Sequence, residues 1–215
     1  MEILTFLIGS FKAGGVFMYA ILAVLAVGTA IVIERARSLF FRNRGDSKRL
    51  WVAVKTNVEN NRLKEALDRC ENEGTFLAHV LGAGIQKRIN TQSEKEIQGA
   101  FEETLLEIQP RLEKRIHYLY ALSNVSTLLG LLGTVTGLIQ SFTAVSIADP
   151  AQKSALLASG ISLALNNTAF GLLIAIVLML SYSFMQSKSA ALEDEIDEFA
   201  LKLLHLLTER SSKSE

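Results

Sequence analysis

Two long segments without a charged side chain limit most strongly how this chain can fold. Residues 118–148 and 154–187 contain no Asp, Glu, Lys, Arg or His. A helix that crosses a bilayer needs about 20 apolar residues, so either segment is long enough to span a membrane. A third apolar stretch covers residues 16–33. The sequence therefore predicts an integral membrane protein with three transmembrane helices.

The remaining sequence also indicates helices. The chain has only two prolines, Pro110 and Pro150, and its apolar residues recur at helical spacing over long stretches. Charged residues make up 20% of the chain and are concentrated outside the apolar stretches. The predicted fold class is all-α, with long helices extending into the cytoplasm and a small cytoplasmic helical module.

Basic residues are unevenly distributed around the predicted spans, and this predicts the topology. They follow the first span and precede the second, whereas the segment before the first span and the loop between the last two contain only Lys12 and Lys153. Cytoplasmic segments carry an excess of Lys and Arg, so residues 34–117 should be cytoplasmic. The N-terminus is then outside and the C-terminus inside. The residues that set this orientation are Arg35, Arg37, Arg42, Arg44, Lys48, Arg49, Arg111, Lys114 and Arg115.

The predicted organisation assigns every residue to one of seven segments. The N-terminus lacks a basic region and a cleavage site, so we expect it to be an amphipathic segment and not a signal peptide. The segments are a periplasmic amphipathic segment 1–15, transmembrane helix 16–33, cytoplasmic helical module 34–117, transmembrane helix 118–145, periplasmic loop 146–154, transmembrane helix 155–184, and cytoplasmic C-terminal helix and tail 185–215.

Local patterns refine the cytoplasmic segments. Asn60 and Asn61 indicate a turn, and Ser93 followed by Glu96 is a capping-box signature for a helix start. The C-terminal segment has an apolar stripe at heptad spacing, which we expect to pack within the assembly, against the same chain or a neighbouring one. The stripe consists of Leu192, Ile196, Phe199, Leu203 and Leu206.

The sequence contains no pattern typical of an enzyme, a metal site, a cofactor site or a nucleic-acid-binding surface. It has no phosphate-binding loop and no Ser/His/Asp set, and the single cysteine, Cys70, excludes a cysteine-cluster zinc site. The three histidines, His79, His117 and His205, are scattered on helical segments. We interpret His117, beside Tyr118, as an interfacial anchor, with a proton-exit relay as the alternative. A non-enzymatic role without a cofactor is predicted.

Small and polar residues lie inside the second and third predicted spans. Rows of small residues let helices approach closely in lipid, which we expect of Gly130, Gly133, Gly137, Gly160 and Gly171. Packing explains the polar residues less well, because two consecutive amides point about 100° apart on a helix. Polar groups at mid-membrane face protein or water and often mark ion pathways. The predicted ion-pathway residues are Thr134, Ser141, Asn166, Asn167 and Thr168.

The predicted spans contain no titratable Asp, Glu, His, Lys or Arg. Hydroxyl and amide groups can solvate a proton or a sodium ion, but they cannot store charge by titrating. If this chain conducts protons, the titrating carboxylate should come from a second polypeptide. Its helix would face Thr134 and Thr168.

Two of these segments resemble the signature segments of a known family. Gly-Leu-Leu-Gly-Thr-Val-Thr-Gly-Leu-Ile at 130–139 and Gly-Ile-Ser-Leu-Ala-Leu-Asn-Asn-Thr-Ala-Phe-Gly-Leu at 160–172 are similar to those of the MotA/TolQ/ExbB proton-channel family, closest to its ExbB/TolQ branch. The resemblance implies a pentamer in the bacterial inner membrane. It also implies an ExbD/TolR-like single-span partner whose aspartate carries the proton, and a TonB/TolA-like energy transducer.

The resemblance assigns Thr134 and Thr168 to the hydroxyls that face the partner's aspartate. Two positions depart from the family pattern, because Leu163 stands where many ExbB-like members have Glu and Thr127 where they have Pro. An ion-driven motor subunit is therefore the leading hypothesis, with sodium as an alternative ion. The other hypothesis is a non-conducting membrane scaffold whose polar rows serve only helix packing.

Overall fold

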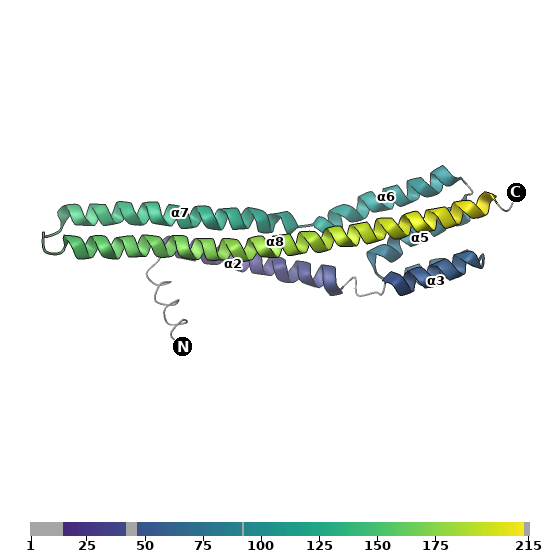
Figure 1. Cartoon of the computed structure of the whole chain (residues 1–215), viewed down its shortest axis with the longest axis horizontal. Helices are drawn as coiled ribbons and strands as arrows, with labels where there is room; N and C mark the ends of the chain where they lie inside the picture. Colours follow the sequence, from purple (N-terminus) through teal and green to yellow (C-terminus); the bar gives the residue numbers. More distant parts are fainter. Residues whose placement is uncertain (1–14, 42–46, 92, 213–215) are drawn as a thin grey trace. The chain divides into compact units, whose positions relative to one another are not determined.

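The computed structural model describes residues 15–41, 47–91 and 93–212 (Figure 1). All regular structure in these ranges is helical, which confirms the predicted all-α class. The predicted N-terminal amphipathic segment lies outside the described residues, apart from Gly15. The elements are α2 (Gly15–Ala36), the π-helical turn η1 (Arg37–Phe41), α3 (Ser47–Glu59), α4 (Leu63–Asn72), α5 (Phe76–Asn90), α6 (Glu94–Glu113), α7 (Ile116–Ile147) and α8 (Lys153–Ser212).

Among the residues that the structure describes, three helical stretches are long and apolar enough to cross a membrane. They are Gly15–Leu39, Glu94–Ile147 and Lys153–Thr208, and they contain all three predicted spans. Large apolar side chains on these helices point away from the protein, as Leu131, Ile139 and Leu180 do. Contiguous exposed apolar surface of this kind is rare on soluble proteins and fits contact with lipid.

The chain forms two compact units. Residues 15–33 and 115–184 form one, called here the membrane unit, and residues 34–114 and 185–212 form the other, called the helical module. Helix α8 contributes to both units. The helical module therefore includes the C-terminal part of α8 as well as residues of the predicted segment 34–117.

Large apolar side chains form the core of the helical module. Helices α3, α4, α5 and α6 contact one another in chain order, and Val54, Leu81 and Ile97 are almost fully buried among them. The ring of Trp51 on α3 lies 5.3 Å from the ring of Phe199 on α8. This aromatic pair anchors α3 to α8, so the predicted apolar stripe packs within the same chain.

The buried stripe on α8 differs from the predicted heptad at both ends. Ile196, Phe199 and Leu203 are buried, but Leu192 and Leu206 are only half-buried, and Leu207 takes the place of Leu206 in the core. An α-helix has 3.6 residues per turn, so 11 residues make close to three complete turns. Leu207 follows Ile196 by 11 residues and so faces the same direction.

Helix ends follow local chemistry, with one correction to the sequence analysis. Asn61 has a φ of 62°, a left-handed conformation that Asn tolerates in turns. The Thr75 hydroxyl accepts a 3.2 Å hydrogen bond from the backbone N–H of Ala78 and caps α5. The predicted capping box at Ser93 is wrong in its side-chain part. Ser93 precedes α6, but its side chain makes no capping hydrogen bond, and its carbonyl instead accepts the N–H of Glu96.

Pro110 lies inside α6, and the helix continues beyond it to Glu113. The break falls at Lys114 and Arg115, and Arg115 has a φ of 63°. The last four carbonyls of a helix have no partner within it. The buried Arg35 donates a 3.3 Å hydrogen bond to one of them, the carbonyl of Arg111, and so stabilises the end of α6.

Candidate functional site

Helices α7 and α8 approach each other closely in the membrane unit, and glycine makes this possible. A Cβ atom on Gly171 would lie 2.8 Å from both the Cα of Gly130 and the carbonyl oxygen of Ser126. A Cβ on Gly130 would lie 3.1 Å from the carbonyl oxygen of Asn167. The atoms in the way belong to the backbone, so a larger residue would push the helices apart.

The same close contact continues along both helices. Gly137 faces Ala164, whose Cβ would lie 3.0 Å from an added Cβ, and Gly160 faces the side chain of Ser141. We call this contact the α7–α8 seam. It consists of Ser126, Gly130, Gly133, Gly137 and Ser141 on α7 and of Gly160, Ala164, Asn167, Thr168 and Gly171 on α8.

Two hydroxyl groups form hydrogen bonds across the seam. The Ser126 hydroxyl donates to the carbonyl of Gly171 at 2.9 Å. The Thr168 hydroxyl donates to the carbonyl of Gly130 at 3.0 Å. Interhelical hydrogen bonds in membrane proteins contribute about 0.6 kcal/mol each on average, so both hydroxyls stabilise the helix pair.

Thr134 and Ser141, the other two hydroxyl residues of the predicted ion pathway, donate within α7. Thr134 is half-buried and donates to the carbonyl of Leu131 at 2.6 Å. Ser141 is buried and donates to the carbonyl of Gly137 at 2.6 Å. A hydroxyl has one donor hydrogen and two acceptor lone pairs. Each oxygen can therefore still accept a hydrogen bond from water or hold a cation, although it cannot titrate.

The two neighbouring amides have different environments, as their angular separation requires. Asn167 is only 3% exposed and lies against Gly133. Its Oδ1 atom is buried and has no hydrogen-bond partner among the described residues. Asn166 is half-buried. An unsatisfied buried acceptor costs about 1–3 kcal/mol, so the Asn167 side chain should destabilise an otherwise close-packed seam unless another group binds its Oδ1 atom.

The structure brings three of the five predicted pathway residues into the seam. Asn167 and Thr168 meet the α7 backbone, and Ser141 meets Gly160. Thr134 follows Gly133 and makes its hydrogen bond within its own helix. Ser126 is a seam residue that the sequence analysis missed. Its spacing of four from Gly130 extends the small-residue row by one turn and could have revealed it.

Other positions singled out in the sequence lie outside the seam. Leu163 is half-buried, and exposed Thr127 donates to the carbonyl of Ser123 at 3.2 Å. The Tyr182 ring lies 6.4 Å from the ring of His117 and 5.5 Å from that of Tyr120. These rings form an aromatic cluster in the membrane unit. Among the described residues, no group of three or more Asp, Glu, His or Cys side chains could hold a metal ion.

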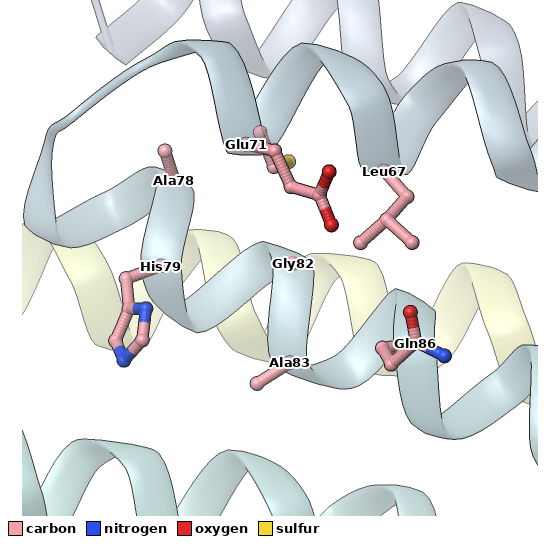
Figure 2. A pocket seen from close by; sticks show the side chains of 8 residues that line it. Leu67, Glu71, Ala78, His79, Gly82, Ala83 and Gln86 are labelled. Atoms are coloured by element: carbon pink, nitrogen blue, oxygen red, sulfur yellow. The ribbon is translucent and has the colours of Figure 1, made fainter.

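A cavity between α4 and α5 in the helical module also contains polar groups (Figure 2). Cys70, Glu71 and His79 are among the residues that line it. Burial raises the pKa of the Cys70 thiol to about 12, and the nearby carboxylates of Glu73 and Glu71 act in the same direction. The thiolate is the reactive form of cysteine, so Cys70 is inert at neutral pH.

The helices and the seam define a class of protein. Three membrane-length helices expose apolar side chains, and two of them pack through glycine and hydroxyl groups, which is typical of helical membrane proteins. The sequence profile of the MotA/TolQ/ExbB proton channel family matches residues 72–198, which include the whole seam. The chain belongs to this family, and the resemblance inferred from the sequence is confirmed.

Two similar proteins extend the match to most of the chain. A putative biopolymer transport protein ExbB homolog of Methanothermobacter thermautotrophicus is 29% identical over 192 residues, which cover 89% of this chain and 66% of that protein. The Tol-Pal system protein TolQ of Haemophilus influenzae is 30% identical over 195 residues, 83% of either chain. The chain thus spans just under two thirds of the first relative's length. The description of the family names a proton channel, and those of the two relatives name biopolymer transport and the Tol-Pal system.

Proposed function

We propose that this chain is the three-span subunit of an ion-driven motor of the ExbB–ExbD or TolQ–TolR kind. The motor converts the proton motive force into mechanical work on a periplasm-spanning or outer-membrane-directed partner. One observation carries the proposal. A family member with no Asp, Glu, His, Lys or Arg in its predicted spans buries hydroxyl and amide groups at mid-helix, including the Asn167 Oδ1, which has no hydrogen-bond partner among the described residues.

In this proposal the ion pathway follows the polar side of α7 and α8. Thr134 and Thr168 face an acidic group supplied by a second polypeptide, and Ser141, Asn166 and Asn167 complete the polar lining. The carboxylate titrates and the hydroxyls solvate the ion as it passes. One elementary charge crossing about 100 mV releases about 2.3 kcal/mol, so the transfer of a few ions supplies enough free energy to shift packed helices.

The proposed setting is the bacterial inner membrane, with the N-terminus outside and the C-terminus inside. Residues 34–117 and 185–215 would then be cytoplasmic, and residues 146–154 would form the periplasmic loop. The subunits would form a pentamer around transmembrane helices of an ExbD/TolR-like partner that contributes the aspartate. A TonB/TolA-like protein would receive the work. The distribution of basic residues and the family membership support this setting.

Thr134→Val is the cleanest test of the pathway, because the Thr134 hydroxyl bonds within its own helix and forms no hydrogen bond across the seam. The chain would be reconstituted with its single-span partner in liposomes, and proton flux would be measured. We expect Thr134→Val to abolish the flux. The matched control is Thr136→Val, which also removes a hydroxyl bonded to the α7 backbone. Flux at the wild-type level in Thr134→Val would reject the assigned role.

Thr168→Val needs a different control, because it also removes a hydrogen bond across the seam. Ser126→Ala removes the equivalent bond to Gly171 without touching a proposed pathway residue. Both variants should lower the thermal midpoint by similar amounts, but only Thr168→Val should abolish flux. Equal flux in the two variants would mean that Thr168 serves packing alone.

A non-conducting scaffold is the second candidate function, and the seam itself favours it. Ser141 lies against Gly160, and Thr168 bonds to the α7 backbone, so packing uses the polar row as well as the glycines. A scaffold would lose assembly on Gly133→Leu. No partner's activity would depend on an ion gradient, and Thr134→Val would have no effect.

Sodium is the alternative ion within the motor proposal. Leu163 occupies the position where many ExbB-like members have Glu, and uncharged oxygen groups can coordinate sodium. Liposomes with separate proton and sodium gradients distinguish the two ions. Flux that follows the sodium gradient and persists without a pH gradient would assign the motor to sodium.

A further inference from the structure

The helical module has an open apolar groove between α6 and α8. Two neighbouring cavities of 140 Å³ and 240 Å³ line up along these helices and share Leu105 and Asp197. Two large apolar side chains lie beside them on the surface, since Leu106 is 70% exposed and Leu201 is 58% exposed. Large exposed apolar residues gathered at one place on a water-facing surface often mark an interaction site.

Carboxylates surround this apolar groove. Glu102 on α6 and Glu193 and Asp197 on α8 line its two cavities. Burial raises the pKa of Glu193 and Asp197, and neighbouring carboxylates raise both further. The placement of these three carboxyl groups makes the groove acidic. We call these three residues, together with Leu105, Leu106 and Leu201, the acidic groove.

Helix α3 of the same module presents a surface with the opposite charge. Its inner face is buried through Leu50, Val54 and Val58, and its outer face carries Val52, which is 60% exposed. Basic residues flank Val52 one helical turn away on both sides. They are Lys48, Arg49 and Lys55, and Lys55 also forms an exposed 3.7 Å ion pair with Glu59 of the same helix. With Val52 the three basic residues form what we call the basic face.

The basic face and the acidic groove are complementary in charge. A helix with one exposed apolar residue between basic residues suits an apolar groove with an acidic border, and an apolar centre with a polar rim is the usual anatomy of an interface. Within one module the basic face points outward, because the Trp51–Phe199 contact holds the other side of α3 against α8. A second copy of the chain is therefore the occupant that these surfaces indicate.

We propose that the basic face of α3 in one copy docks into the acidic groove of the next copy. The contact joins two different surfaces, so it is heterologous, and such contacts build closed rings when the rotation closes. This inference rests on the proposed homo-oligomer and adds the surfaces that join its subunits. Val52 contacts Leu106 and Leu201, and the basic residues pair with the three carboxylates of the acidic groove.

Cysteine cross-linking of the full-length chain tests the docking directly. Two differently tagged chains, both with Cys70→Ala, would carry Val52→Cys and Leu201→Cys respectively and be co-expressed in the membrane. We expect an oxidised dimer that contains both tags. Val52→Cys expressed alone should give no dimer, because the basic face does not meet itself. A dimer of Val52→Cys alone, without the mixed dimer, would overturn the proposal.

Charge reversal gives a second, independent measurement. Lys48→Glu and Asp197→Lys should each weaken assembly of the purified chain about tenfold, as read from the dissociation midpoint on dilution in lipid nanodiscs. The pair combined in one chain should recover assembly. Asp68→Lys, an exposed carboxylate on α4, is the matched control and should have no effect.

The outcomes separate this inference from the proposed oligomer. A chain that assembles normally but shows neither the mixed cross-link nor an effect of charge reversal would refute the docking and leave the oligomer intact. A wild-type chain that stays monomeric in the membrane would refute both. Loss of assembly in Asp197→Lys that Lys48→Glu does not restore, without a mixed cross-link, would also refute the docking.

Discussion

The membrane unit and the helical module hold their helices together in different ways. In the membrane unit, α7 and α8 meet through Gly130, Gly171 and the hydroxyls of Ser126 and Thr168. In the helical module, bulky residues such as Leu81 fill the core, and ion pairs lie on the surface. These pairs include Lys55–Glu59, Arg62–Glu65 and Lys87–Glu96.

The difference follows from the surroundings of each unit. In water, burying apolar surface stabilises the fold by about 25 cal/mol per Å², so the helical module places its large side chains inside. Lipid tails are as apolar as leucine, so burial gains little there, and close backbone packing with interhelical hydrogen bonds takes over. Leu131 and Leu180 accordingly point outward, while glycine occupies the contact.

The largest effect should come from removing a bulky core residue of the helical module. Phe199→Ala deletes a buried ring that contacts Trp51 and should destabilise the module by about 4 kcal/mol. The measurement is the midpoint of thermal unfolding in detergent, followed by the fluorescence of the only tryptophan. An unchanged midpoint would show that large side chains do not hold this module together.

A single added methyl group should have almost as large an effect in the membrane unit. Gly171→Ala would place a Cβ 2.8 Å from backbone atoms of α7 and should destabilise the unit by about 3 kcal/mol, an ordinary cost of overpacking. The matched control is Gly99→Ala in α6, where an added Cβ meets nothing within 4 Å. That control should instead stabilise its helix, by about 1 kcal/mol. Equal changes in stability for Gly171→Ala and Gly99→Ala would show that close glycine packing does not distinguish the membrane unit from the helical module.

The buried Cys70 thiol predicts that the free energy of unfolding of the helical module depends on pH. In the folded protein the pKa of Cys70 is about 12, whereas the ordinary pKa of the thiol is 9.0. Unfolding therefore releases a proton between these values, so stability is full below pH 9 and falls above it. The slope should approach about 1.4 kcal/mol per pH unit. Unfolding measured from about pH 8 to 10 should show this fall in the wild type but not in Cys70→Ala, and a slope that persists in Cys70→Ala would assign it to other groups.

The smallest effect should come from one hydrogen bond in the seam. Ser126→Ala removes the bond to the Gly171 carbonyl and should cost about 0.6 kcal/mol, the average for such bonds. The thermal midpoint in nanodiscs would measure it. A loss above about 2 kcal/mol would show that polar contacts, and not close glycine packing, provide most of the stability of the seam.

Much of this architecture could be predicted from the sequence because it depends on local composition. The absence of charge in residues 118–148 and 154–187 defines two membrane-length helices without reference to any neighbour. The spacing of Gly130, Gly133 and Gly137 likewise places small residues along one side of a helix. These features depend on the solvent around a segment and on the helical repeat, both of which a single chain segment specifies.

Only the tertiary structure decided which side chain meets which. It places Asn167 in the seam and Asn166 to one side, adds Ser126 to the contact, and substitutes Leu207 for Leu206 in the α8 core. Neighbouring residues on a helix differ by about 100° in direction, and periodicity alone does not say where the partner helix lies. The sequence by itself determined which segments are apolar helices and where their small residues fall, whereas packing against a second helix determined which of those residues are buried.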